Sequence, residues 1–268
     1  ADELQQVKKK YAVPRRTQII YEFQTAAGPD PEEDIPDYPV HVFLSKDGYF
    51  KKITPASLRM SSEQKYKEGD GPFLAWEGTN RDELLVFTDK QQCYKTFLSE
   101  FDDAKASVLG DYLPTKLGFD EGERFLWACT PGDYSGQLLF FFENGRAARV
   151  ELSAYQTQTR RRKPTGAYSD KSPLAAAWLL REDMEMAVYS TEGRVVVFHT
   201  ASLNPKSTRS TQGVNVMTLK PKYKVETARP LAQTPIQNPA RYRARSLPVA
   251  GMLLREEDRA EKQLTLLE

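Results

Sequence analysis

One frame of residues recurs four times in this chain, and it constrains the possible fold more than any other feature. SKDGYFKKITPASL (45–58) and STEGRVVVFHTASL (190–203) both pass through an acidic-Gly pair and end on Ala-Ser-Leu. TDKQQCYKTFLSEF (88–101) and FENGRAARVELSAY (142–155) fit the same frame. In every copy a turn residue precedes an apolar anchor by ten positions; the four pairs are Gly48 and Leu58, Gln91 and Phe101, Gly145 and Tyr155, and Gly193 and Leu203. Such regular recurrence indicates one supersecondary unit repeated about every 50 residues.

Each copy reads as a β-hairpin. An apolar stretch precedes each turn: VHVFL, ELLVFT, QLLFFF and MEMAVY. Asp47-Gly48 and Asn144-Gly145 predict two-residue type I′ turns, which need positive φ at both positions. Glu192-Gly193 is a weaker version of this signal, and Lys90-Gln91 lacks glycine, so we expect a different turn there. A second strand then returns, and the anchor packs onto the core.

Repeated hairpins of this length predict an all-β, propeller-like array of about four blades, or five if the tail holds a degenerate one. The alternative is a meandering β-sandwich in which the similarity between the copies is accidental.

Composition limits the chemistry. No run of about 18 apolar residues exists that could span a membrane, and the polar N-terminus is unlike a signal peptide. The start at Ala1 rather than Met suggests a fragment of a longer chain. The only cysteines are Cys93 and Cys129, which points to a reducing cytosol and buried thiols. With two histidines (His41 and His199) and no metal-ligand spacing, we expect no metal site and no cofactor.

Charge is unevenly distributed along the chain. From Gly193 to Arg255 there are eleven Lys/Arg and one acid, Glu226. The loops after the third and fourth hairpins hold most of the basic residues, and equivalent loops of a repeat should emerge on the same rim. We therefore expect a basic stripe suited to phosphate contacts; its members are Arg160, Arg161, Arg162, Lys163, Lys206 and Arg209.

Several stretches resemble the C-terminal portion of the A subunit of bacterial type IIA DNA topoisomerases, the family of DNA gyrase and topoisomerase IV. The similarity spans roughly residues 1–225. The stretches that carry it are ADELQQVKKKYAVPRRTQI (1–19), VFLSKDGYFKKI (42–53), LLVFTDKQQCYKTFLSEF (84–101), LGDYLPTKLGFDEGERF (109–125) and STRSTQGVNVMTLK (207–220).

The resemblance implies a β-pinwheel that binds double-stranded DNA without reading its sequence and bends it around a basic edge. The implied DNA-binding residues are Lys65, Lys67, Arg160, Arg161, Arg162, Lys163, Lys171, Lys206, Arg209, Lys220 and Lys222. It implies no catalysis within this chain, because the family's DNA-cleaving tyrosine lies upstream and its ATPase belongs to a different polypeptide. The implied protein partners are the ATPase B subunit, together with the catalytic region of the same subunit, in the bacterial cytoplasm at the nucleoid.

The resemblance also suggests domain boundaries. We expect the end of a helix from the catalytic region at 1–24, an acidic Pro-rich linker at 25–38 and the β-pinwheel at 39–225. The tail at 226–268 could supply a closing strand and a C-terminal helix.

One departure from the family concerns activity. Gyrase carries a basic, Gly-rich box after the first hairpin, whereas this chain reads SSEQKYKEGDGP (61–72) there. We therefore expect a topoisomerase IV-like role in decatenation and relaxation rather than gyrase-like supercoiling. The alternative is a propeller whose basic rim docks acidic protein partners. An enzymatic reading lacks any catalytic constellation.

Overall fold

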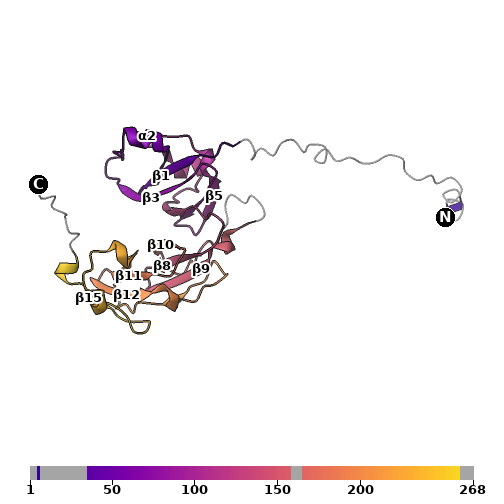
Figure 1. The fold of residues 1–268 in the computed structure, drawn as a ribbon. Helices are drawn as coiled ribbons and strands as arrows, with labels where there is room; N and C mark the ends of the chain where they lie inside the picture. The colour runs from indigo at the N-terminus through magenta and orange to yellow at the C-terminus, as the bar shows by residue number, and fades with distance from the viewer. Residues whose placement is uncertain (1–4, 7–34, 158–164, 260–268) are drawn as a thin grey trace, which may run out of the picture. The chain divides into compact units, whose positions relative to one another are not determined.

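Four β-hairpins, one from each copy of the repeated frame, organise the fold (Figure 1). The computed structural model describes residues 5–6, 35–157 and 165–259, and contacts group the chain from Asp37 onward into one unit, separate from residues 1–36. The antiparallel hairpins are β1 (Pro39–Ser45) with β2 (Tyr49–Ile53), β4 (Glu83–Thr88) with β5 (Cys93–Phe97), β8 (Gln137–Phe142) with β9 (Arg146–Glu151), and β11 (Glu185–Ser190) with β12 (Arg194–His199).

The four turns share one backbone feature, which differs from the predicted type I′. The turn residue has positive φ in every copy: +90° at Gly48, +54° at Gln91, +85° at Gly145 and +77° at Gly193. The preceding residue does not, and the Gly48 amide donates to the Ser45 carbonyl at 3.1 Å. This is a three-residue loop that needs the left-handed region only at its last position. The type I′ prediction is therefore wrong, and so is the prediction of a different second turn, because Gln91 takes the glycine's conformation.

A third strand pairs with the first strand of each hairpin. Each such strand lies at one edge of its sheet. It follows its hairpin within the same copy of the repeat. The four are β3 (Pro72–Thr79), β7 (Phe125–Cys129), β10 (Leu174–Leu180) and β14 (Val225–Pro230).

The second strand of each hairpin pairs, on its outer side, with a segment that comes later in the sequence than its own copy of the repeat. β6 (Asp111–Tyr112) pairs with β2, and β13 (Val214–Asn215) pairs with β9. On the second hairpin the same place holds a bridge between Gln92 and Thr165. On the fourth it holds β15 (Met252–Leu253), which follows the last hairpin. We call these pieces the exchanged segments.

Hairpin, third strand and exchanged segment make up each of blades 1 to 4. The sheet orders are β3-β1-β2-β6, β5-β4-β7, β10-β8-β9-β13 and β14-β11-β12-β15. The predicted all-β, propeller-like pinwheel is confirmed, and the part of the chain that the structure describes forms four blades rather than five.

The hydrophobic cores lie between neighbouring blades, which explains the continuous apolar runs. Leu84 and Val86 of β4 face the cluster shared with blade 1, while Leu85 and Phe87 face the cluster shared with blade 3. A strand buried on both faces has no polar side, so strict alternation of apolar and polar residues is absent.

Each anchor sits in, or directly after, a short helical turn that follows the second strand. Phe101 and Tyr155 are buried against the preceding blade, with ring centroids 4.2 Å from Phe50 and 5.6 Å from Phe87 respectively. Leu203 is buried in the cluster of blades 3 and 4. Leu58 is only partly buried, contrary to the expected anchor role, because no described blade precedes blade 1. The helical elements are α2 (Pro55–Met60), α3 (Leu113–Leu117), η2 (Leu98–Glu100), η3 (Leu152–Tyr155), η4 (Thr200–Ser202), η5 (Leu231–Gln233), η6 (Pro239–Arg241) and η7 (Glu256–Asp258).

Several predicted features lie wholly or largely outside the described residues. These are the helix at 1–24 (apart from the helical residues 5–6), the linker at 25–38 up to residue 34, and the tail from residue 260 onward. Within the described ranges, no helix is long and apolar enough to cross a membrane.

Candidate nucleic-acid interface

A segment without acidic residues lies along the edge of blade 3. The chain from Asn204 to Leu219 contains no Asp or Glu. It is fixed at one end by the Lys206 amide, which donates to the Arg149 carbonyl at 2.9 Å, and at the other by the Val216 amide, which donates to Gly145 at 2.9 Å. The segment therefore covers the whole of β9, and the predicted residues Lys206 and Arg209 lie on one edge.

Arg209 is held in place by an aromatic ring. Its guanidinium carbon lies 5.9 Å from the centroid of Tyr155, the third anchor. Burial raises the pKa of the Tyr155 hydroxyl well above its ordinary value, and this hydroxyl donates to the Ala167 carbonyl at 2.5 Å. A neutral, fixed ring thus orients the arginine by a cation–π contact, while Lys206 is exposed.

The predicted lysines at the hairpin-turn end of blade 4 are partly neutralised. Lys220 forms an ion pair with Glu192, and its hydrogen bond lowers the pKa of that carboxyl. Lys224, which was not predicted, pairs with Glu143 at 2.6 Å. Lys222 lies between them in the sequence and is exposed.

Blade 1 gives the predicted Lys65 and Lys67 an acidic setting. Both are exposed, but Glu63, Glu68 and Asp70 surround them in sequence. The Lys65 carbonyl accepts from the ammonium of Lys51 at 3.1 Å, so its backbone serves the blade's own packing.

Of the remaining predicted residues, one is paired and four lie outside the described part of the chain. Lys171 lies beside Asp170, with 3.4 Å between the ammonium and carboxylate. Arg160, Arg161, Arg162 and Lys163 lie outside the described residues. The described residues that flank them are fixed, because Thr157 accepts from Lys95 at 3.3 Å and Thr165 bridges Gln92. Both flanking residues therefore contact blade 2.

Exchanged segments differ in charge from blade to blade. On blade 1, the chain from the Lys52–Asp103 bridge region to the exchanged segment β6, residues 102–112, carries Asp102, Asp103 and Asp111 against a single cation, Lys105. The segment on blade 3 is free of acids. Chain 35–130 has 12 Lys/Arg against 16 Asp/Glu, whereas chain 131–259 has 20 against 12. The charge of blades 3 and 4 would therefore attract a polyanion more strongly than that of blades 1 and 2.

Three other basic residues bind neighbouring parts of the protein rather than a ligand. The sequence analysis did not predict this role. The position four residues after the turn holds Lys52, Lys95 and Arg149 in blades 1 to 3, each with its side chain 3–11% exposed. Lys52 pairs with Asp103 at 3.3 Å, and Lys95 donates to the Tyr155 carbonyl at 3.4 Å. Each cation thus reaches the anchor region of the next unit. A cation recurring at a fixed place in the frame was the signal that could have revealed them.

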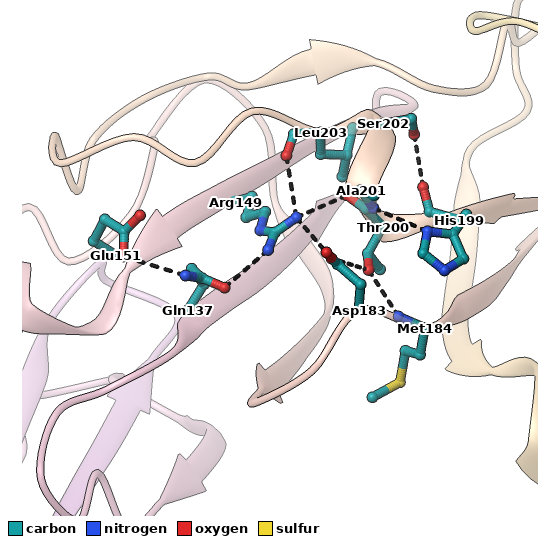
Figure 2. A network of polar contacts seen from close by, with 10 residues as sticks. All are labelled: Gln137, Arg149, Glu151, Asp183, Met184, His199, Thr200, Ala201, Ser202 and Leu203. Atoms are coloured by element: carbon teal, nitrogen blue, oxygen red, sulfur yellow. Dashed lines mark hydrogen bonds and ion pairs between the residues drawn. The ribbon is translucent and has the colours of Figure 1, made fainter.

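Arg149 is the centre of the most connected of these networks (Figure 2). Its guanidinium lies 2.8 Å from Asp183 and donates to the carbonyls of Thr200 and Leu203 at 3.0 and 3.4 Å. The Thr200 hydroxyl donates to Asp183 at 2.7 Å, and this bond together with Arg149 lowers the pKa of the Asp183 carboxyl. These buried cations are unavailable to a ligand.

Blade 4 breaks this pattern. The equivalent position is Val197, which packs with Tyr242 of the tail in a small apolar cluster. Among the described residues after Val197 there is no further hairpin whose carbonyls would need a cation, and an apolar contact takes the place of the ion pair.

The described residues offer no obvious centre for catalysis by thiol or metal. Cys93 and Cys129 are free and buried, and burial raises the pKa of the Cys93 thiol to about 12. Among residues 35–157 and 165–259, no three His, Cys, Asp or Glu side chains gather as a metal site would require.

Comparison with known proteins agrees with the repeat and the fold. The family model of the DNA gyrase C-terminal domain, a β-propeller, matches residues 190–232, which contain β12, β13 and β14. The A subunit of DNA topoisomerase 4 from Bacillus subtilis is 28% identical over 201 residues, covering 74% of this chain and 24% of that protein. Its counterpart in Staphylococcus epidermidis is 27% identical over 226 residues, covering 82% of this chain and 28% of that protein. The chain thus spans about a quarter of the length of these relatives.

Solved structures share the architecture. The C-terminal domain of DNA topoisomerase IV superposes with a TM-score of 0.64 at 23% identity, covering 75% of this chain and 64% of that one. The E. coli ParC C-terminal domain gives 0.58 at 15%, covering 81% and 94%. At these identities the structural likeness establishes the fold alone. Family match, curated relatives and fold agree, and the resemblance of this chain to the C-terminal domain of the A subunit in bacterial type IIA topoisomerases is confirmed.

Proposed function

We propose that this chain is the DNA-binding and DNA-bending part of the A subunit of a type II DNA topoisomerase, and that it holds duplex DNA through phosphates rather than base edges. The observation that carries the proposal is the acid-free segment Asn204–Leu219 laid along β9, with Lys206 exposed and Arg209 fixed on Tyr155. Hydroxyl residues and cations on one edge suit phosphate contacts, which position DNA without reading its sequence.

The size of this edge fits a bound duplex. β9 has six residues and so spans roughly 20 Å, about six base pairs of DNA. Bending a site of 20–30 bp costs about 1–6 kcal/mol, and neutralised phosphates on successive blades would offset that cost.

The proposed role within the enzyme is to present a DNA segment for strand passage. We infer that the chain is non-catalytic by itself. It works with the catalytic region of its own subunit, which precedes it, and with an ATP-hydrolysing B subunit, in the bacterial cytoplasm at the nucleoid. The names of the curated relatives support this context.

Topoisomerase IV-like decatenation and relaxation is favoured over gyrase-like supercoiling. In the segment 61–72, the Asp70 carboxylate accepts from the amides of Asp47 and Gly71 at 3.1 and 2.7 Å. An acid fixed at the site of gyrase's basic box would repel DNA there. Reconstitution of the full A subunit with its B subunit should decatenate DNA without introducing negative supercoils; negative supercoiling would refute this preference.

Salt-dependent DNA binding tests the central proposal. Affinity for a short duplex should fall steeply with salt, with a log–log slope of about −0.9 per phosphate contact. Lys206→Gln/Arg209→Gln should weaken binding and flatten that slope. The matched control, Lys90→Gln/Lys105→Gln, removes the same charge from exposed positions of blades 1 and 2. Absence of binding at low salt, or equal losses in both variants, would contradict the proposal.

A further inference from the structure

The tail beyond the last hairpin contacts blade 4 as the exchanged segments contact earlier blades. The Leu254 amide donates to the Gly193 carbonyl at 2.9 Å, as Val216 does to Gly145 at 2.9 Å and Leu113 to Gly48 at 3.0 Å. At its other end, the Val197 amide donates to the Tyr242 carbonyl at 2.8 Å. Val197 and Arg243 thus form a parallel bridge, as Val150 and Lys206 do on blade 3.

A glycine at an equivalent place supports this correspondence. Gly110, Gly213 and Gly251 all have positive φ and come three residues before Leu113, Val216 and Leu254. A Cβ on Gly251 would lie 2.7 Å from the Val195 carbonyl oxygen, and one on Gly213 would lie 1.9 Å from that of Ala147. The described part of the tail, up to residue 259, is thus a further exchanged segment that holds no hairpin of its own.

The side chains of this segment alternate between protein and solvent. Tyr242 is 2% exposed and Ala244 packs on the core, whereas Arg241 and Arg245 are exposed. From residue 227 to residue 255 the chain contains no Asp or Glu. The edge of blade 4 therefore repeats the charge character of blade 3.

The arginine between these two is already paired. Arg243 makes a bidentate contact with Glu185, with both nitrogen–oxygen distances 2.7 Å. Its charge is offset within the blade. Arg241 and Arg245, two residues away on either side, are the ones available to an anion.

The segment is fixed rather than loose. The Tyr242 hydroxyl donates to Asp258 at 2.5 Å, and the same carboxylate accepts from the Gln237 amide at 2.7 Å. Leu254 and Ile236 pack beside Tyr242. Because the backbone is held on both sides, a ligand bound by this edge need not order it, which favours affinity.

We propose that the tail presents Arg241 and Arg245 to DNA phosphates and so extends the binding edge from blade 3 to blade 4. This inference rests on the proposed DNA-binding function and assigns a further contact surface to it. A DNA duplex that lies along the exchanged segments would contact basic edges on blades 3 and 4. On blade 1 it would contact an acidic edge.

The test uses the full chain and a 30-bp duplex titrated at several salt concentrations. Arg241→Gln/Arg245→Gln should weaken binding several-fold and reduce the salt slope by about two, since each lost phosphate contact removes about 0.9. Arg241→Lys/Arg245→Lys should keep most of the affinity. The matched control is Glu185→Gln/Arg243→Gln, which removes the neighbouring pair without changing the net charge and should bind like wild type.

The outcomes separate this inference from the function on which it rests. If Lys206→Gln/Arg209→Gln weakens binding while Arg241→Gln/Arg245→Gln does not, the tail surface is refuted and the proposed function stands. If the unaltered chain fails to bind at low salt, the proposed function fails. Thermal unfolding of each variant checks the fold, and Arg241→Gln/Arg245→Gln should unfold at the wild-type temperature because both side chains are exposed.

Discussion

The Arg149 guanidinium on β9 of blade 3 lies 2.8 Å from the Asp183 carboxylate, which precedes β11 of blade 4. The same side chain donates to the carbonyl of Thr200 in η4 and to that of the anchor Leu203, which directly follows this turn. One largely buried cation therefore links two blades through an ion pair and two hydrogen bonds to backbone carbonyls. Lys52 and Lys95 occupy the same place in blades 1 and 2, so this contact is part of the repeat.

Arg149→Met should destabilise the junction of blades 3 and 4. It leaves Asp183 and two carbonyls without their cation, and breaking a buried pair costs about 3–5 kcal/mol. Because Asp183 is 38% exposed, we expect about 2–3 kcal/mol. Arg149→Lys should lose less, since it keeps the charge. Urea denaturation measures both.

Lys171→Met is the control for Arg149→Met. The Lys171 side chain is 61% exposed, so its replacement should change the unfolding free energy by less than about 0.5 kcal/mol. Equal midpoints for Arg149→Met and wild type would show that the network does not hold the blades together.

Two turn glycines should respond differently to alanine. Gly145 and Gly193 have similar φ, yet a Cβ on Gly145 would lie 2.2 Å from the Met217 carbonyl oxygen, whereas on Gly193 the nearest atom is 3.9 Å away. Gly193→Ala should cost about 1 kcal/mol, for the left-handed conformation alone. Gly145→Ala should cost clearly more, because the exchanged segment must move. Thermal unfolding compares the two, and equal losses would contradict the close approach.

The repeated frame predicted the hairpins because each holds its signal locally. β4 and β8 appear as apolar runs, and the turn residue and anchor keep a fixed spacing. The exchanged segments were not predicted as such. β6, β13 and β15 have two residues each, too few to show periodicity, and their partners lie far away in the sequence.

The sequence predicted which loops are basic but not how each charge is used. Lys206 and Arg209 do share one edge. Lys220 is paired with Glu192, a residue 28 positions earlier, which no local pattern reveals. The accessibility of a charge depends on tertiary neighbours, whereas a count of Lys and Arg treats all of them alike.

Both cysteines should resist thiol reagents in the folded chain. Cys93 and Cys129 are buried, and burial raises the Cys93 pKa to about 12, so the thiolate is scarce at a pH of about 8. Iodoacetamide should therefore label neither residue until urea unfolds the chain, as read by mass spectrometry. Rapid labelling of native protein would show that the core of blades 2 and 3 opens readily.

Docking of the tail should weaken in acid through Asp258. The Tyr242 hydroxyl and the Gln237 amide hold the pKa of this carboxyl below its ordinary value, which is about 3.9 in an unfolded chain. A group with a lowered folded pKa stabilises above the unfolded pKa, and its contribution is lost as pH falls through the folded value. Hydrogen exchange at the Val197 amide, which donates to the Tyr242 carbonyl, reports on docking.

At neutral pH, Asp258→Asn should speed exchange at the Val197 amide relative to wild type, and the difference should shrink as pH falls below about 4, where the carboxyl of an undocked tail takes up a proton. The Leu85 amide, in the core strand of blade 2, serves as the internal control and should not respond to the substitution. A difference that persists unchanged to about pH 3 would show that the carboxylate charge does not hold the tail, because at that pH the carboxyl of an undocked tail is largely protonated and the charged form no longer favours docking as strongly.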